Sequence, residues 1–142
     1  MPRILGVDYG SRRIGLAVSD PSATIAQPLP TLPRRAGKRP PVHAISQIVK
    51  QQEIAGIVVG LPLTLAGDES DWTREVRDFG AKLAERTGVP VEFIDERMTS
   101  VRAEKAVREL GLKKTEREQK GRIDAASALL ILQAHLDRRI RE

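Results

Sequence analysis

The chain has 142 residues, of which 40% are hydrophobic and 30% charged, so it is expected to fold as one domain over residues 1–142. It contains no cysteine, which excludes thiol nucleophiles, zinc-thiolate sites, iron-sulfur clusters and disulfide scaffolds. The net charge of +5 is compatible with a polyanionic partner such as nucleic acid.

The positive charge is concentrated in two segments, 34–39 and 113–122, and the remaining residues are slightly acidic. A solvated surface explains either segment alone as well as a nucleic-acid contact does. The longest stretch without charge, Ile54–Gly67, is shorter than the roughly 20 residues of a membrane helix. Because Asp8 also precedes any apolar signal core, we expect a cytoplasmic protein with no membrane partner.

Two short apolar runs begin the chain, Arg3–Asp8 and Ile14–Ser19, and the turn between them contains Gly10. This pattern predicts an antiparallel hairpin with Asp8 at its inner mouth. A third extended stretch, Ala26–Leu32, contains two prolines, which is typical of an edge strand.

The rest of the chain alternates between helical and strand patterns. Apolar spacing predicts helices over 42–49 and 72–83, and continuous apolar runs predict strands over 54–60 and 91–95. Two further helices are expected, one from Thr99 or Ser100 to Leu110 and one over Ile123–Ile140. The order predicts an α/β fold with a mixed five-stranded sheet, in which an antiparallel three-strand meander precedes parallel strands and helices cover both faces.

Carboxylates stand at the ends of three of these elements. Asp8 ends the first strand, Asp95 and Glu96 end the fifth, and Asp124 opens the last helix, whose positive end favours an ionised carboxylate. Because ligands gather at the carboxyl ends of parallel strands, three acids could converge there on Mg²⁺ or Mn²⁺. Only one of Asp95 and Glu96 can face such a site, since strand residues alternate between faces. Each acid alone could equally be a turn former, an ion-pair partner or a helix cap.

Four ordered segments carry a family resemblance: G-V-D-Y-G-S-R-R-I-G-L-A-V-S-D, I-V-V-G-L-P-L-T-L-A-G, F-I-D-E-R-M-T-S and G-R-I-D-A-A-S-A-L-L-I-L. Together they closely resemble the YqgF family of bacterial proteins, also called RuvX, whose fold is ribonuclease H-like. The resemblance implies a nuclease that matures the 5′ end of pre-16S ribosomal RNA; an older label for the family is Holliday-junction resolvase, which would cleave DNA.

The resemblance also implies which residues act. The catalytic acids would be Asp8, Glu96 and Asp124, which would hold a pair of Mg²⁺ or Mn²⁺ ions. Hydrolysis by such a site needs no protein nucleophile. Ser127 stands where many ribonuclease H-like enzymes carry a fourth acid, so the second ion is expected to bind weakly.

Five residues are candidate nucleic-acid contacts. Gly10 would allow close approach of the phosphate backbone, and Tyr9 beside the metal site is the best candidate for stacking on a base. Arg97 could grip a phosphate or could brace Asp95, and the sequence does not decide between the two. Lys120 and Arg122 flank the third acid and are expected to follow the nucleic-acid backbone.

Two other functional classes compete with a nuclease. A nucleotide-binding enzyme of the sugar-kinase type also uses an aspartate followed by a glycine turn, but it needs two such domains. A non-catalytic RNA-binding or transcription antitermination factor could retain the fold, although binding alone would not need three carboxylates beside a polyanion. The sequence leaves open whether the protein is a monomer or a homodimer.

Overall fold

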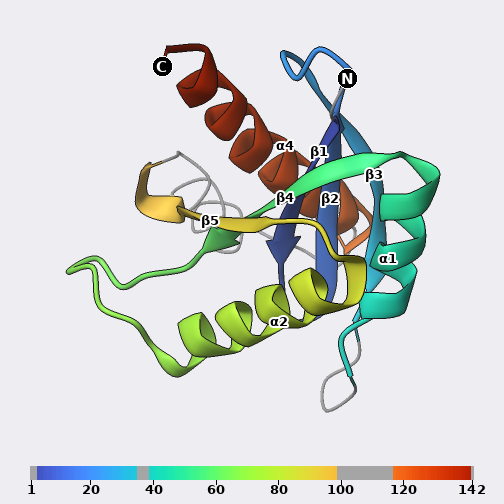
Figure 1. The fold of residues 1–142 in the computed structure, drawn as a ribbon. Helices are drawn as coiled ribbons and strands as arrows, with labels where there is room; N and C mark the ends of the chain where they lie inside the picture. The colour runs from blue at the N-terminus through green and yellow to red at the C-terminus, as the bar shows by residue number, and fades with distance from the viewer. Residues whose placement is uncertain (1–2, 35–38, 99–116, 142) are drawn as a thin grey trace.

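The computed structural model describes residues 3–34, 39–98 and 117–141; within these ranges the side chains of residues 98, 117–125 and 140–141 lie outside the description. Its centre is a five-stranded sheet in the order β3-β2-β1-β4-β5 (Figure 1). The strands are β1 (Arg3–Tyr9), β2 (Arg13–Ser19), β3 (Ala26–Pro33), β4 (Ile54–Leu61) and β5 (Val91–Asp95).

The central strand β1 joins the two halves of the sheet. It pairs antiparallel with β2 and parallel with β4, while β3 adds antiparallel to β2 and β5 adds parallel to β4. This arrangement confirms the predicted mixed sheet, its meander and the position of the proline-containing strand at an edge.

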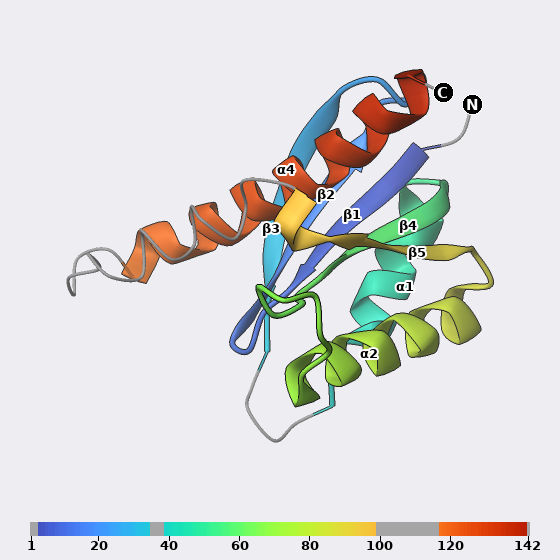
Figure 2. The same ribbon diagram turned by 90° about the vertical axis from the view of Figure 1, so that its left-hand side faces the viewer.

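Helices cover both faces of the sheet, as the sequence predicts (Figure 2). α1 (Val42–Gln51) and α2 (Asp71–Thr87) pack on one face and α4 (Arg117–Arg141) on the other. Alternation along β1 explains the two cores, because Leu5 and Val7 face α1 and α2, whereas Ile4 faces α4. No helix in the described ranges is both long and apolar enough to span a bilayer.

The ends of α2 follow local sequence signals. Ser70 and Thr73 form a reciprocal capping box at its start, and Gly88 ends it with a left-handed backbone (φ 74°). The capping box fixes where the segment between β4 and α2 returns to the body of the protein.

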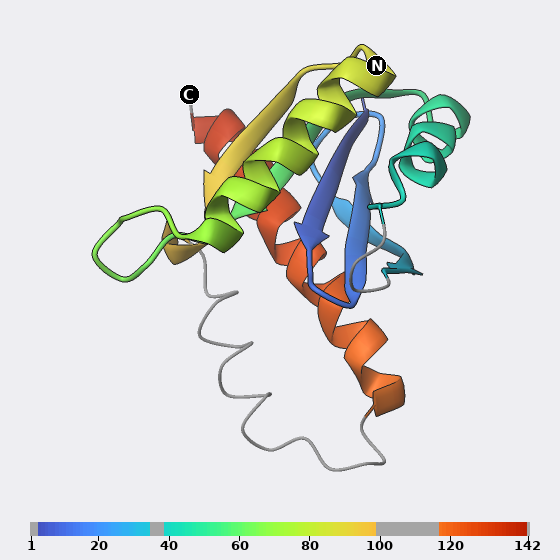
Figure 3. The ribbon, with the colours of Figure 1, turned by 90° about the horizontal axis from the view of Figure 1, so that it is seen from below.

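The last helix begins earlier than the sequence pattern predicts. α4 starts at Arg117 instead of Ile123, so Asp124 lies about two turns inside the helix and does not open it. Figures 2 and 3 show the first turns of α4 extending beyond the sheet. The helix dipole acts mainly within the first turn, so the expectation that it stabilises an ionised Asp124 is wrong. The helix expected between residue 99 or 100 and Leu110 lies outside the described residues.

Candidate active site

Asp8 occupies the carboxyl end of the central strand. Its side chain is only 2% exposed, and the residue lies opposite Gly15 of β2. By alternation it shares the face of Ile4 and Gly6, which is the face covered by α4. The fold thus places a buried carboxylate under the last helix.

Glu96 lies on this same face, two strands away. It is the first residue of the 3-10 turn η1 (Glu96–Met98) that follows β5, and it is 6% exposed. Its Oε1 atom is 2.8 Å from the point where a Cβ on Gly60 would stand. The Glu96 carboxylate therefore occupies the space that the missing side chain of Gly60 leaves open.

The strand register places this space beside Asp8. Val7 pairs with Val59, so the next residues, Asp8 and Gly60, lie at the same level of neighbouring strands, which are about 4.8 Å apart. Gly60 itself pairs with Ile94 of β5. The Glu96 carboxylate extends from β5 over β4 toward the strand of Asp8, so two buried acids share one end and one face of the sheet.

Asp95 points elsewhere and is paired with Arg97. The Arg97 guanidinium donates from Nη2 to Asp95 Oδ2 at 2.7 Å and from Nε at 3.0 Å, and the backbone N–H of Arg97 donates to Oδ1 at 2.9 Å. These hydrogen bonds raise the pKa of Arg97 above its ordinary value. Of the two roles that the sequence left open for Arg97, the structure supports bracing Asp95.

For the third predicted acid, Asp124, the structure gives only the position of its backbone on α4. Position 124 lies one turn before Ser127, which is buried on α4, and four residues before Ala128, which packs on the sheet. The side chains of Asp124, Lys120 and Arg122 are outside the described part. Among the described side chains, no group of three or more acidic or histidine residues is arranged to hold a metal.

Tyr9 does not take the predicted position beside the acids. Its side chain is 4% exposed, and its ring stacks on Phe79 at 4.1 Å and on Trp72 at 5.4 Å between ring centroids. Burial also raises the pKa of its hydroxyl. Because Tyr9 follows Asp8 in a strand, it faces α2 on the opposite side, so the proposed role in stacking on a base is wrong.

The basic segment after β3 begins with a structural arginine. Arg34 lies over the Tyr9 ring at 4.5 Å, donates to the Gly10 carbonyl at 3.2 Å and pairs with Glu75 at 3.3 Å. Its side chain is nearly buried, which makes it a poor phosphate contact in this conformation. Residues 35–38 lie outside the description.

Gly10 has a structural reason to be glycine. A Cβ there would lie 2.4 Å from the Arg13 carbonyl oxygen, to which the Gly10 N–H donates at 3.0 Å. Any side chain would therefore disrupt the β1–β2 turn, and close approach of a phosphate is not needed to explain the residue.

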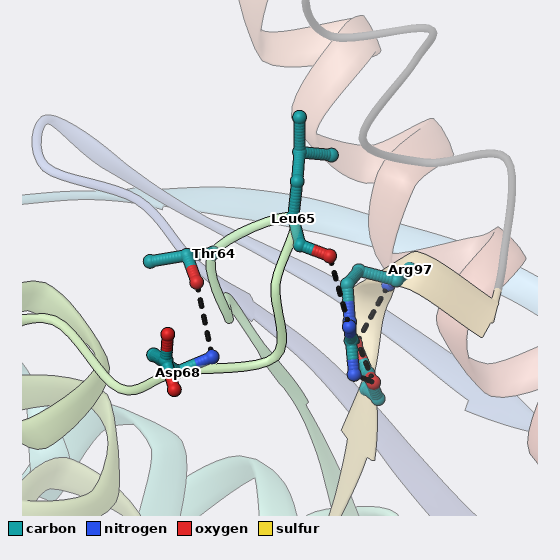
Figure 4. A network of polar contacts seen from close by, with 5 residues as sticks. Thr64, Leu65, Asp68 and Arg97 are labelled. Carbon is teal, nitrogen blue, oxygen red and sulfur yellow. Dashed lines mark hydrogen bonds and ion pairs between the residues drawn. The ribbon is translucent and has the colours of Figure 1, made fainter.

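Sequence reasoning missed two features of the site. The first is that Gly60 leaves room for the Glu96 carboxylate. The sequence does carry a signal for it, because Gly60 is two residues after Val58 and so faces α4 as Val58 does. The second is the segment 62–70 between β4 and α2, whose carbonyl at Leu65 accepts from Arg97 Nη1 at 3.2 Å (Figure 4). Only the fold brings that segment to the end of β5.

Comparison of the sequence with known proteins finds relatives over almost its whole length. Residues 2–138 match the RuvX family, which is described as "Holliday junction resolvase". A Koribacter versatilis protein named "Putative pre-16S rRNA nuclease" is 47% identical over 137 residues, covering 96% of this chain and 88% of the relative. An Anaeromyxobacter protein of the same name (strain K) is 44% identical over 137 residues, covering 96% of this chain and 98% of the relative.

Comparison of the structure identifies the fold. Thermus thermophilus RuvC in complex with a Holliday junction substrate aligns with a TM-score of 0.58 at 17% identity, covering 99% of this chain and 96% of that one. A fowlpox virus resolvase with Holliday junction DNA aligns with a TM-score of 0.55 at 6% identity, covering 97% and 99%. At such low identity the likeness shows the fold alone, and that fold is ribonuclease H-like, as expected.

Proposed function

Because this chain belongs to the RuvX family, we propose that it is a nuclease whose Asp8, Glu96 and Asp124 hold the divalent metal ions for phosphodiester hydrolysis. Its substrate in this proposal is the 5′ end of pre-16S ribosomal RNA, the RNA in the names of its relatives. The same reaction would also cleave other single-stranded nucleic acids and DNA junctions.

One observation carries the proposal: the Glu96 carboxylate lies over Gly60, at the level of Asp8 and on the same face of the sheet. Two buried carboxylates at one strand end repel each other when both are ionised, and a cation between them would remove that repulsion. The covering helix α4 supplies position 124 on its sheet side, one turn before the buried Ser127.

The donor set fits a hard cation. All three proposed ligands are carboxylates, and oxygen ligands are those that Mg²⁺ and Mn²⁺ prefer. Divalent ions bound there would activate water for attack on phosphorus and would stabilise the charge that develops on the phosphate oxygens. We propose that the site binds a pair of such ions, and that the second is held weakly because Ser127 offers no carboxylate.

In this proposal each of the chain's own residues has a distinct role. Asp8 at the end of β1 and Glu96 in the turn η1 would orient the ions, and Arg97 keeps Asp95 paired elsewhere by its hydrogen bonds. Lys120 and Arg122 add positive charge to the helix that bears Asp124, which would attract the nucleic-acid backbone. The protein acts as a monomer or a homodimer.

Substitution of Asp8 tests the function directly. We expect Asp8→Asn to lower Mg²⁺- or Mn²⁺-dependent cleavage by at least about 100-fold, because loss even of a residue that orients a metal ligand commonly costs 10- to 100-fold. Nucleic-acid affinity should be kept or increased, since one negative charge is removed. The measurement is cleavage of labelled pre-16S RNA, single-stranded RNA and DNA, and a four-way junction, beside binding to each.

The matched control is Asp78→Asn, the same chemical change on the exposed surface of α2, which should leave cleavage unaltered. Unchanged cleavage by highly purified Asp8→Asn protein would contradict the assignment. Wild-type protein that retains RNA but does not cleave it with either metal would instead support the RNA-binding factor.

A further inference from the structure

Leu65 has an apolar side chain that is exposed to solvent near the proposed active site. It is 84% exposed, and it lies in the segment 62–70 that leaves the carboxyl end of β4. A single exposed leucine is ordinary on a protein surface. Its location and the way its backbone is fixed are the informative features.

The segment is braced by its own hydrogen bonds. The N–H of Thr64 donates to the Asp68 carbonyl at 2.9 Å, and the N–H of Gly67 donates to the Thr64 carbonyl at 2.9 Å. The N–H of Asp68 donates to the Thr64 hydroxyl at 3.0 Å. Leu65 therefore stands at the tip of a tight, internally bonded turn.

Arg97 ties this tip to the end of β5. Its Nη1 donates to the Leu65 carbonyl at 3.2 Å while the same guanidinium holds Asp95. Gly67, at φ 92°, lies against the guanidinium, and a Cβ there would be 3.1 Å from Nη1. Figure 4 shows the Leu65 side chain pointing away from Arg97 and from Asp68. The contact thus fixes the backbone and leaves the side chain free to meet a partner.

The chemistry of the tip favours a base over a phosphate. Residues 64–67 carry no charge and Asp68 follows them directly, whereas the next acids, Glu69 and Asp71, are paired with Arg77 and Arg74 of α2. Residues 64–68 therefore offer a phosphate group no positive charge, whereas the isobutyl side chain of Leu65 packs well on the flat, apolar face of a nucleobase. In a regular duplex neighbouring bases cover that face, so it is available only where stacking is interrupted.

We propose that Leu65 is an apolar wedge that packs against an unstacked base next to the phosphate that the ions at Asp8 and Glu96 would hold. Arg97 is its positioning residue, since it fixes the tip against the segment that bears Glu96. The proposal rests on the proposed nuclease function and specifies its substrate as single-stranded or distorted nucleic acid in preference to regular duplex.

The experiment uses the full chain and nucleic acids that carry 2-aminopurine, whose fluorescence rises when stacking is lost. The probes are a single-stranded RNA and a DNA four-way junction, bound with Ca²⁺ in place of Mg²⁺ so that the carboxylates hold a divalent ion. Binding is recorded on probe that gel analysis shows to be uncleaved. Wild-type protein should raise the fluorescence. Leu65→Ala should reduce this rise and weaken binding by about tenfold, the scale expected for loss of one buried leucine side chain.

Two variants complete the series. Leu65→Met keeps an apolar side chain of similar reach and should retain most of the signal. Ile25→Ala is the matched control, because Ile25 is also exposed, at 60%, but lies in the β2–β3 turn at the opposite end of the sheet. It should behave as wild type.

The outcomes distinguish the wedge from the nuclease function. Equal fluorescence and affinity for Leu65→Ala and wild type would overturn the wedge, even if both cleave RNA. No rise with wild-type protein would overturn it as well. A Leu65-dependent rise without metal-dependent cleavage would support the wedge and refute the nuclease. If Leu65→Ala changes only self-association, the leucine is a protein contact and the wedge is wrong.

Discussion

Two side chains lie so close to Gly60 that they depend on its lacking a Cβ. A Cβ there would stand 2.6 Å from Cδ1 of Ile131 and 2.8 Å from Oε1 of Glu96. We expect Gly60→Ala to destabilise the protein by about 1–3 kcal/mol, the usual cost of overpacking, and to displace the Glu96 carboxylate. Under the proposed function, cleavage at a temperature where the variant remains folded should fall, and more Mg²⁺ should be needed for half-maximal rate.

Gly56 provides a control in the same strand. It has the same parity as Gly60, but a Cβ there would meet nothing within 4 Å. Gly56→Ala should be neutral or stabilising by about 0.5–1 kcal/mol, because alanine loses less backbone entropy on folding. Urea unfolding and a metal titration of both variants make the comparison. Equal metal dependence for Gly60→Ala and Gly56→Ala would contradict the role given to Gly60.

The alternation of strand residues between the two faces of the sheet also explains why one candidate residue, Tyr9, lies away from the acids. Local pattern singles out Asp8 because it lies near the end of a strand, and Glu96 because it follows one. Consecutive strand residues face opposite ways, so Tyr9 cannot share the face of Asp8. The same alternation predicts that the tyrosine packs in the α2 core, where it lies. The environment of Glu96 depends on strand pairing and was not available from local pattern.

Most strands and helices could be predicted because the signals that start and end them lie within a few residues. The hairpin, the prolines of β3 and the glycine stop of α2 each act within a few residues. The start of α4 was misjudged because the residues before Ile123 are polar and lack the apolar periodicity used to predict it. Glutamate, glutamine, lysine and arginine are nonetheless good helix formers, and they extend the helix to Arg117.

Arg34 links three elements through one side chain. It covers the Tyr9 ring from the end of β3, approaches the Trp72 ring within 5.6 Å and pairs with Glu75 of α2. We expect Arg34→Ala to lower the free energy of unfolding by about 1–3 kcal/mol, through lost packing, cation–π contact and hydrogen bonds. Arg34→Lys should restore little, because lysine lacks the planar guanidinium. Urea unfolding followed by Trp72 fluorescence measures both.

Arg39 is the matched control within the same basic segment. It is exposed, so Arg39→Ala removes the same charge without removing these contacts. The free energy of unfolding should stay within about 0.5 kcal/mol of wild type. If the two alanine variants were equally stable but Arg34→Ala bound nucleic acid more weakly, Arg34 would be a binding residue and its structural role would be wrong.

Gln133 connects α4 to the β2–β3 turn, at the end of the sheet opposite Asp8. Its Oε1 accepts from the N–H of Ala26 at 3.1 Å, and its Nε2 donates to the Thr24 carbonyl at 3.1 Å. These partners are more than 100 residues away in sequence, so no local pattern predicts the contact. The β2–β3 turn must hold its shape for Gln133 to reach both groups.

Asp20 holds that turn and makes it sensitive to acid. Its carboxylate accepts from the N–H groups of Ile25 at 3.0 Å and Thr24 at 2.9 Å and from the Ser22 hydroxyl, and these bonds hold its pKa well below the ordinary value of 3.8. A carboxyl with a lowered folded-state pKa contributes stability above its unfolded-state pKa, and this is lost as pH falls toward the folded-state value. Asp20→Asn should therefore be less stable than wild type near neutral pH, with a difference that shrinks below about pH 4. Urea unfolding between about pH 6 and pH 3 measures this, with Asp78→Asn as the exposed control. Parallel pH profiles for wild type and Asp20→Asn would show that this carboxylate does not couple the turn to acid unfolding.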